Sequence, residues 1–468
     1  MPQTKIQNTY IAAFLISALL LFAPLIASGK SVYALLTLEL VSIVLFALVL
    51  WTPRSRKRVA LIVWLATAFF FLIPCFYLIP VPESLWVALP GRADFAASQQ
   101  WLEQQTAGTG LAFSLVPQKT LHALIALLPI LTVALATATR PARHLITLTY
   151  VVLAMAAAQA ALGLLQYSTQ LESLYFWSDP NRNAQGTYLN RNHFAVMMYL
   201  PLPIALGLLA LNMGKYPKMR DEAEKPQFDK WLVKTLFIAF VVILLILGGI
   251  LSRSRTGIFL TIAAIFISSF LFARHIGGAR SGSVAASASV IAAGIAFSVG
   301  LIPIVNRFIS KNPMEDLRWE LFEVTREGIS KFFPVGSGPG TFQEIYRTIQ
   351  PYDQRLFINH VHNDYLELLF EIGAVGMVVL FLLLVLYIYG WIALRGMRWH
   401  EIRFIKVGAG ISLFLIMLHS LVDFNMHTPA NALLVAFLAG VFLAKIPEDE
   451  LQTRRRRKRA KREASTEA

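Results

Sequence analysis

Residues 372–394 read Ile-Gly-Ala-Val-Gly-Met-Val-Val-Leu-Phe-Leu-Leu-Leu-Val-Leu-Tyr-Ile-Tyr-Gly-Trp-Ile-Ala-Leu, a run with no charged side chain. About 20 consecutive apolar residues are enough to carry a helix across a bilayer. The wider apolar segment, residues 365–394, is long enough to tilt in the membrane or to project beyond it. This stretch predicts a transmembrane helix and indicates the class of the whole protein.

The composition agrees with a membrane protein. The chain has 468 residues, of which 56% are hydrophobic and 15% are charged, whereas an average soluble domain carries about 25% charged residues. The one cysteine, Cys75, excludes an internal disulfide and a cysteine-based metal site. The net charge of +15 does not indicate a nucleic-acid partner, because the excess lies in membrane-flanking loops and in the basic tail at 454–459.

Twelve apolar segments are long enough, or nearly so, to span a bilayer. They lie near 9–28, 32–51, 59–80, 119–139, 143–166, 193–213, 231–251, 257–273, 285–303, 365–394, 406–424 and 430–445. With a cytoplasmic N-terminus, the basic-rich connections fall on the inside, as the positive-inside rule requires. These connections are residues 54–58, 140–143, 215–234, 274–280, 395–403 and the tail.

The alternating connections, 81–118, 168–192, 252–256, 304–364 and 425–429, then lie outside. We therefore predict an all-α polytopic membrane protein with about 12 transmembrane helices. Residues 1–468 form a single transmembrane domain, residues 304–364 form one large periplasmic helical loop inserted in it, and residues 446–468 form a disordered, basic cytoplasmic tail. Both termini are expected to be cytoplasmic. Within the loop, apolar spacing predicts an amphipathic helix from Glu315 to Phe333 over the membrane domain and a short helix at Phe342–Ile349.

Three polar stretches stand where a membrane protein is usually apolar, and all three are predicted on the outer side. They are Asn190-Arg191-Asn192-His193, Ser252-Arg253-Ser254-Arg255-Thr256-Gly257 and His360-Val361-His362-Asn363-Asp364. Charge kept at membrane ends is costly and usually functional. Their common side predicts that they meet in one site.

The residue types in these stretches suggest acid–base and anion-binding chemistry. His362, beside His360 and Asn363 where a helix begins, can act as a general base or simply cap and pack at the interface. Arg191 stands at a helix start, where free N–H groups attract anions, although it can equally face lipid headgroups. Arg253 and Arg255 lie in a tight outer turn, which favours a buried anion site over snorkelling to headgroups.

A last polar cluster runs from His419 to Pro429 and contains Asp423 at an outer helix end. Asp423 is expected to pair with one of the arginines, either as a structural salt bridge or to orient it. The glycine-rich segment Gly336–Phe342 lacks the Lys-Ser/Thr of a nucleotide loop, so it predicts a sharp turn. No metal site is predicted, since His360-x-His362 alone is a weak signal, and no cofactor is expected.

Together these motifs resemble the O-antigen ligase and polymerase superfamily. Its signature is a histidine followed by Asn, Ser or Gln, then nine residues, then Gly-x-x-Gly, which here is His362-Asn363, residues 364–372, and Gly373-Ala374-Val375-Gly376. Four further motifs resemble the family in the same order, at 186–195, 254–257, 336–342 and 419–425. The resemblance covers about residues 160–425.

The resemblance implies a metal-independent, inverting glycosyltransferase of the bacterial inner membrane that acts on its periplasmic face. Such an enzyme takes a glycan from undecaprenyl pyrophosphate and moves it to an acceptor sugar hydroxyl, in lipopolysaccharide or other polysaccharide biosynthesis. Carried over by position, Arg191 and Arg255 would bind the pyrophosphate, and His362 would accept the acceptor proton or hold the hydroxyl. Asn190, Asn192, His193, Arg253, His360, Asn363 and Asp423 are the remaining expected substrate-binding residues, and no family role is assigned to Arg253.

The acceptor stays open within this class. An O-antigen ligase would use lipid A-core, a surface or exopolysaccharide polymerase another lipid-linked glycan, and a protein O-oligosaccharyltransferase a protein; the ligase is slightly favoured. A polysaccharide flippase or transporter is the alternative from a different class, but it would be expected to show related halves and midplane charges. The sequence shows no internal repeat.

Overall fold

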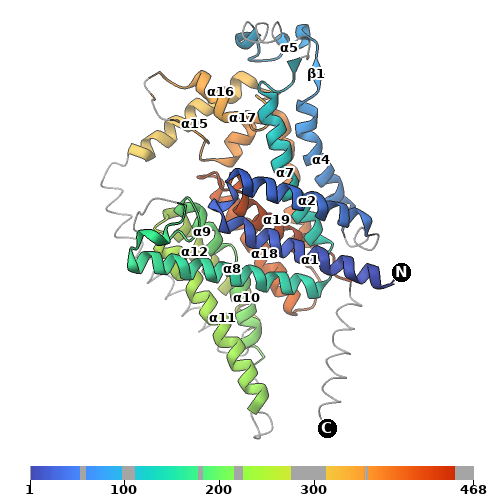
Figure 1. The fold of residues 1–468 in the computed structure, drawn as a ribbon, viewed down its shortest axis with the longest axis vertical. Helices are drawn as coiled ribbons and strands as arrows, with labels where there is room; N and C mark the ends of the chain where they lie inside the picture. Colours follow the sequence, from blue (N-terminus) through green and yellow to red (C-terminus); the bar gives the residue numbers. More distant parts are fainter. Residues whose placement is uncertain are drawn as a thin grey trace.

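The computed structural model describes residues 2–52, 59–96, 111–177, 183–215, 225–275, 313–352, 354 and 357–447 (Figure 1). In chain order the elements are α1 Pro2–Leu25, η1 Ala27–Gly29, α2 Val32–Trp51, α4 Leu61–Tyr77, β1 Pro80–Val81, α5 Glu83–Ala88, η2 Ala93–Phe95, β2 Leu111–Ala112, α7 Pro117–Ala138, α8 Ala142–Thr169, η3 Glu172–Leu174, α9 Arg191–Tyr199, α10 Leu202–Met213, α11 Lys225–Leu251, α12 Arg255–Phe272, η5 Ala273–His275, α15 Pro313–Phe332, α16 Phe342–Ile349, α17 Asp364–Ala393, α18 Glu401–His419, η8 Asn425–His427 and α19 Pro429–Leu443. The two short strands pair antiparallel, with Pro80 opposite Ala112. Helices make up most of the described structure, as predicted.

The predicted spans correspond closely to these helices. Among the described residues, nine helices are long and apolar enough to cross a membrane, and two shorter apolar helices, α4 and α19, match the segments predicted at 59–80 and 430–445. The remaining predicted span, 285–303, lies outside the described residues. The described helices are those expected of an all-α polytopic membrane protein.

The burial pattern of the helices also fits a lipid environment. Leu36, Leu40 and Ile43 of α2 are each about half exposed, and their spacing places them on one helix face. An apolar stripe of this kind is unfavourable in water and suits hydrocarbon. By contrast, 89% of the residues in the most apolar part of the span Arg191–Met213 are buried, so this span forms the centre of the bundle.

This central span, predicted as one helix over 193–213, is a single span with a local interruption of the helix at Leu200 and Pro201. α9 ends at Tyr199, and α10 begins at Leu202, directly after Pro201. Proline has no N–H to donate, and its ring crowds the preceding turn, so the helix is interrupted there. The hydroxyl of Ser412 in α18 donates a hydrogen bond to the carbonyl of Leu200, which satisfies backbone polarity at the break.

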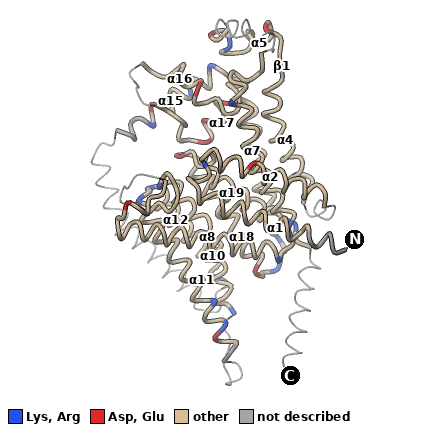
Figure 2. The backbone as a smooth tube through the Cα atoms, viewed as in Figure 1, with Lys and Arg blue, Asp and Glu red and all other residues tan. Residues whose placement is uncertain are grey.

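The connections fall into two groups whose members contact one another. On the side predicted to be outer, Leu189 N–H donates to Ser28 Oγ (3.3 Å), Ala184 N–H to Leu251 O (3.0 Å) and Leu115 N–H to Ser337 O (2.8 Å). On the other side, Arg140 donates to Thr9 O (3.4 Å), Lys234 pairs with Glu401 (3.7 Å) and His275 packs on Trp399 (3.9 Å). Figure 2 shows charged residues gathered at helix ends and around α5, α15 and α16, whereas the middle of the bundle is mostly uncharged.

A small layer outside the bundle is built from α5, the β1–β2 pair, α15 and α16. Both helices predicted in the 304–364 segment are present among its described residues, and α16 has the predicted bounds Phe342–Ile349. Leu321, Val324 and Phe332 of α15 are buried, as the amphipathic pattern predicted. Phe332 packs edge-on against Phe370 of α17 at 5.6 Å, so α15 is seated on the first turns of α17 (Figure 1).

The glycine-rich segment forms the sharp turn that was predicted. Ser337 N–H donates to Phe370 O at 3.1 Å, and Gly338 N–H donates to Glu371 O at 2.7 Å, so the turn lies directly on α17. At this point α17 has a non-helical residue, Gly373, with φ of 50° and ψ of −127°. A Cβ on Gly373 would overlap the carbonyl of Pro334. The contact therefore requires glycine, both for its positive φ and for the close approach.

Candidate active site

The phenyl ring of Phe424 is the point at which the distant polar stretches meet. The ring of His360 stacks on it at 4.6 Å, and the rings of His362 and His193 meet it edge-on at 4.7 and 4.9 Å. The ammonium of Lys30 lies 5.4 Å from the ring centre. Two of the three stretches, 190–193 and 360–364, are thus brought together as predicted. They meet at Phe424, which belongs to the cluster from His419 to Pro429.

His362 is held by the start of α17. Its backbone has a positive φ of 58°, and the next residue, Asn363, caps the helix by accepting hydrogen bonds from Tyr365 N–H and Leu366 N–H, both at 3.0 Å. The Asn363 amide also donates to Leu421 O at 2.9 Å. Asn363 was predicted to bind substrate, but both lone pairs of its side-chain oxygen are already used. Its contacts indicate that it positions His362.

Asp423 is the partner of His362. Its Oδ1 lies 3.3 Å from His362 Nδ1, and its side chain is 2% exposed against 27% for His362. The sequence predicted an arginine as the partner of Asp423. The structure instead pairs Asp423 with His362, because the turn after α18 folds back on the start of α17. Asp364 N–H donates to Ser420 O at 2.9 Å, and this contact places Asp423 beside the imidazole of His362.

The surroundings of Asp423 favour its charged form. Burial alone would raise the pKa of Asp423, but the hydrogen bond with His362 and the nearby His193 and His419 hold that pKa well below its ordinary range. His419 Nε2 lies 3.7 Å from Asp423 Oδ2, and the hydroxyl of Tyr199 is 2.9 Å from His419 Nδ1. With Asp423 accepting at Nδ1, the exposed Nε2 of His362 is the nitrogen able to take a proton.

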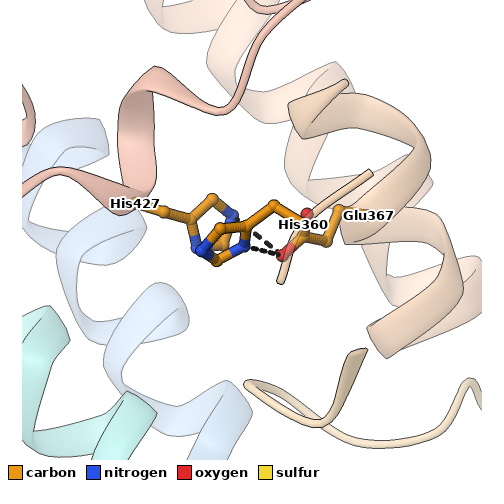
Figure 3. Close-up of side chains that lie close together, drawn as sticks. All are labelled: His360, Glu367 and His427. Carbon is orange, nitrogen blue, oxygen red and sulfur yellow. Dashed lines mark hydrogen bonds and ion pairs between the residues drawn. The ribbon is translucent and has the colours of Figure 1, made fainter. Parts of the chain in front are cut away.

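A second cluster joins His360, Glu367 and His427 (Figure 3). His360 Nδ1 and His427 Nε2 lie 2.8 and 3.3 Å from the same oxygen of Glu367, whose side chain is 3% exposed. The other Glu367 oxygen accepts the N–H of Val361 at 3.0 Å. Burial lowers the pKa of His360 to about 3 and that of His427 to about 4, so both rings are neutral near pH 7.

This cluster is also the place, within the described residues, where a metal ion could be held. One ligand atom from each of His360, Glu367 and His427 lies within 4.8 Å of the others. Two imidazoles and a carboxylate form a known zinc ligand set. The same contacts also satisfy the three side chains by hydrogen bonding alone, and they clamp the segment before α17 to η8.

Arg191 opens α9, and His193 in the first turn of this helix contacts Phe424. The residues gathered around Phe424, namely Lys30, His193, His360 and His362, are called the mouth below. Asn190 is the N-cap, and its side chain accepts Asn192 N–H at 2.8 Å. His193 is buried, with Nδ1 2.9 Å from the hydroxyl of Thr428, and its backbone carbonyl accepts from Asn431 at 3.2 Å. His193 therefore locks α9 to the start of α19 and leaves the partly exposed Arg191 at the helix N-terminus.

Arg255 occupies the equivalent position on α12. Ser254 is the N-cap and accepts Gly257 N–H at 3.2 Å. A Cβ on Gly257 would overlap that of Ala195, so the first turn of α12 lies against α9 and the two helix starts are neighbours. Arg253 is exposed and stands 5.5 Å from the ring of Tyr167. The third predicted stretch thus adjoins the first, and its two arginines have different surroundings.

The sequence analysis missed four residues of this site: Lys30, Glu367, Phe424 and His427. Lys30 is the one charged residue in the α1–α2 turn, a connection too short to stand out. Glu367 lies one helical turn after Asn363 inside an apolar segment, where a carboxylate is costly and points to function. That signal could have found Glu367, whereas Phe424 lies in the motif at 419–425 but carries no polar group that would single it out.

Part of the chain matches a known protein family. A protein-family model described as O-antigen ligase matches residues 240–381. The matched part contains the start of α12 with Arg255 and the start of α17 with His362 and Glu367, whereas Lys30, Arg191 and Asp423 lie outside it. No curated protein matches the chain.

Proposed function

The chain belongs to the O-antigen ligase superfamily, a family of glycosyltransferase-like enzymes, and from this premise we propose that it transfers a glycan from undecaprenyl pyrophosphate to an acceptor sugar hydroxyl. The acceptor we favour is lipid A-core, which makes the protein an O-antigen ligase. The reaction is metal-independent and inverts the anomeric carbon. One observation supports this most directly: the His362–Asp423 pair lies in the same mouth as the start of α9, which carries Arg191.

In the proposed reaction, the acceptor hydroxyl gives its proton to Nε2 of His362 as its oxygen attacks the anomeric carbon. Asp423 is hydrogen-bonded to Nδ1 of His362, so it orients the imidazole ring and stabilises the imidazolium that forms. The bond from the anomeric carbon to the phosphate oxygen breaks on the opposite face, and its electron pair leaves with the diphosphate. Negative charge grows there, so Arg191 and Arg255, each at a helix N-terminus, stabilise the transition state more than the ground state.

A small apolar hollow lies between helices near the site. It is lined by residues of α1, α8, α9 and α19, among them Leu20, Pro24, Met155, Met197 and Leu434. The hydroxyl of Thr187, three residues before Asn190, donates to the carbonyl of Pro24, which links this hollow to the polar mouth.

The proposed topology has twelve spans, cytoplasmic termini and the site on the periplasmic face of the inner membrane. Residues 304–364 form the periplasmic loop, and 446–468 a cytoplasmic tail. Introduced cysteines at positions 191, 255 and 362, in a Cys75→Ser background, should react with a membrane-impermeant maleimide from the periplasm. Labelling only after the inner membrane is opened would refute this orientation.

The alternative acceptors are another lipid-linked glycan, for a polymerase, and a protein, for an O-oligosaccharyltransferase. Deleting the gene in its native host separates them by product. Loss of capped lipopolysaccharide with lipid-linked polymer accumulating means ligase. Lipopolysaccharide with a single repeat unit, or loss of a secreted polysaccharide, means polymerase, and a missing protein glycoform means an oligosaccharyltransferase. A flippase predicts instead that lipid-linked glycan stays on the cytoplasmic leaflet.

The direct test uses the purified full chain, a lipid-linked glycan and an acceptor glycolipid. His362→Ala and Arg255→Ala should each abolish transfer while expression and membrane insertion are kept. Arg347→Ala is the matched control, because Arg347 is an exposed arginine of α16 that stands over Phe357 at 4.5 Å. Normal transfer by both test variants would overturn the proposed mechanism.

A further inference from the structure

We propose that Lys30 is a further substrate-binding residue, whose ammonium takes a phosphate oxygen of the lipid-linked donor. This inference rests on the proposed function and adds a third cation to the two arginines. It starts from the α1–α2 turn, which no sequence motif marks and which the family match does not cover.

The turn that presents Lys30 has an unusual backbone. Three consecutive residues have positive φ: Ala27 at 49°, Ser28 at 59° and Gly29 at 82°. A residue other than glycine in this conformation costs of order 1–3 kcal/mol, and such strain gathers at functional sites. A relaxed connection between two antiparallel helices has no need of it, so the conformation indicates that the position of Lys30 matters.

Surrounding contacts fix the strained turn. Ser28 is fully buried and its hydroxyl accepts Leu189 N–H at 3.3 Å. A Cβ on Gly29 would approach the Cβ of Pro429, at the start of α19, to 2.9 Å. The turn is therefore wedged between the segment leading to Arg191 and the segment following His427. Lys30 is placed by these two contacts and not by its own side chain.

The ammonium of Lys30 is held in the mouth with unused hydrogen-bonding capacity. It stands 5.4 Å over the ring of Phe424, which supplies cation–π attraction but accepts no ordinary hydrogen bond. Among the described residues, no carboxylate lies within ion-pairing distance of its Nζ, and no acceptor is hydrogen-bonded to it. The acidic group that acts on it electrostatically, Asp423, is already hydrogen-bonded to His362. A half-buried ammonium with three donors calls for an acceptor.

The position indicates what that acceptor is. The ring of Phe424 is in contact with Lys30 and also with His362, the proposed base, and with His193 of α9, two residues after Arg191. An anion bound to Lys30 would therefore lie near both His362 and the first turn of α9, which carries Arg191. In the donor, the group between the reacting carbon and the lipid is the diphosphate. Lysine is a point-charge phosphate ligand, and it complements the planar forks of Arg191 and Arg255.

The experiment measures binding, independently of transfer. The full-length protein in detergent is titrated calorimetrically with farnesyl diphosphate, a short prenyl diphosphate. Lys30→Gln should weaken binding about tenfold or more, as expected for loss of a charged hydrogen bond, and Lys30→Arg should restore most of it. Lys119→Gln is the matched control, because Lys119 is a lysine of the same outer region that pairs with Glu344 at 2.7 Å. Unchanged affinity in folded Lys30→Gln would overturn the inference.

Further arms separate the possible failures. If Arg255→Ala loses affinity and Lys30→Gln does not, Lys30 is wrong and the proposed function stands; if the wild type fails to bind the diphosphate, the proposed function fails. A loss seen with phosphatidylglycerol vesicles but not with farnesyl diphosphate would mean a headgroup contact and overturn the donor assignment. Should Lys30→Gln not fold, acetylation of the wild type followed by mass spectrometry decides: farnesyl diphosphate must protect Lys30 and leave Lys119 reactive. Equal protection of both lysines, or of neither, refutes the inference.

Discussion

Asp423→Asn is the most informative single change, because it keeps the shape of the site and alters one charge. The carboxylate is 2% exposed and lies 3.3 Å from His362 Nδ1. An amide in its place can turn its NH2 toward Nδ1, which then accepts a hydrogen bond, so that Nε2 carries the proton and is no longer a base. It also removes the negative charge that stabilises the imidazolium.

The magnitude follows from the part that a positioned base plays. General-base catalysis contributes about 10²–10⁴-fold, and each tenfold change in rate corresponds to about 1.4 kcal/mol of activation free energy. Because His362 is only 27% exposed and Asp423 is its buried partner, we expect most of that contribution to be lost. The barrier should rise by about 3–5 kcal/mol, with farnesyl diphosphate affinity changed less than threefold.

The assay compares initial transfer rates of Asp423→Asn, His362→Ala and the double variant. If Asp423 acts through His362, the double variant should be no slower than His362→Ala alone, since both changes disable one unit. Glu344→Gln is the control, as it removes a carboxylate from an outer ion pair whose members are about one-third exposed. An Asp423→Asn protein that transfers glycan within threefold of the wild type, or independent effects in the double variant, would refute the reasoning.

Three further predictions concern other parts of the site. Gly373→Ala should lower the free energy of unfolding by about 1–3 kcal/mol and slow transfer, because the added Cβ meets Pro334. Gly396→Ala is the control, because Gly396 also has a positive φ (76°) but nothing lies within 4 Å of an added Cβ, so this variant measures the cost of the backbone conformation alone. A fall in the free energy of unfolding that is as large or larger in Gly396→Ala would contradict a packing cause for Gly373→Ala. Thermal stability should fall as pH drops from about 6.5 toward 4: burial lowers the folded-state pKa of His360 to about 3 and of His427 to about 4, so the unfolded chain binds protons that the folded chain does not. His427→Gln should flatten this dependence, and an unaltered pH profile would exclude the cause. EDTA should leave transfer unchanged, because Glu367 is already satisfied by His360, His427 and Val361 N–H; loss of transfer, restored by zinc, would instead establish a metal at this cluster.

The bundle was predictable because apolar length is a local signal. The segments expected at 32–51 and at Phe342–Ile349 are helices with those bounds. The break at Pro201 was not anticipated, since an isolated proline within an apolar run can bend a helix or interrupt it. At the interruption, the carbonyl of Leu200 accepts a hydrogen bond from the hydroxyl of Ser412, which lies more than 200 residues away in sequence.

Which residues form the site was easier to predict from the sequence than which of them contact one another. The segments that carry His362 and Arg191 meet at Phe424, and two helix starts on one side of a bundle are confined to one surface. The partner of Asp423 depends on how a five-residue turn folds after His419, which no periodicity encodes. Phe424 and Lys30 were missed for a related reason: their importance comes from aromatic contacts between separate elements, and neither residue type stands out in its own segment.

The arrangement of charge around Phe424 explains how one site can hold both the proposed base, His362, and three cations, Lys30, Arg191 and Arg255. His362 must be neutral before it takes a proton and charged afterwards, so a cation beside it would weaken it as a base. Asp423 supplies the compensating negative charge at Nδ1, and burial keeps the neighbouring His360 and His427 neutral near pH 7. The arginines enter from α9 and α12, at helix N-termini, where partial positive charge already favours an anion. Positive charge is thereby concentrated where the proposed leaving group departs, and the buried carboxylate of Asp423 lies on the other side, next to the proposed base.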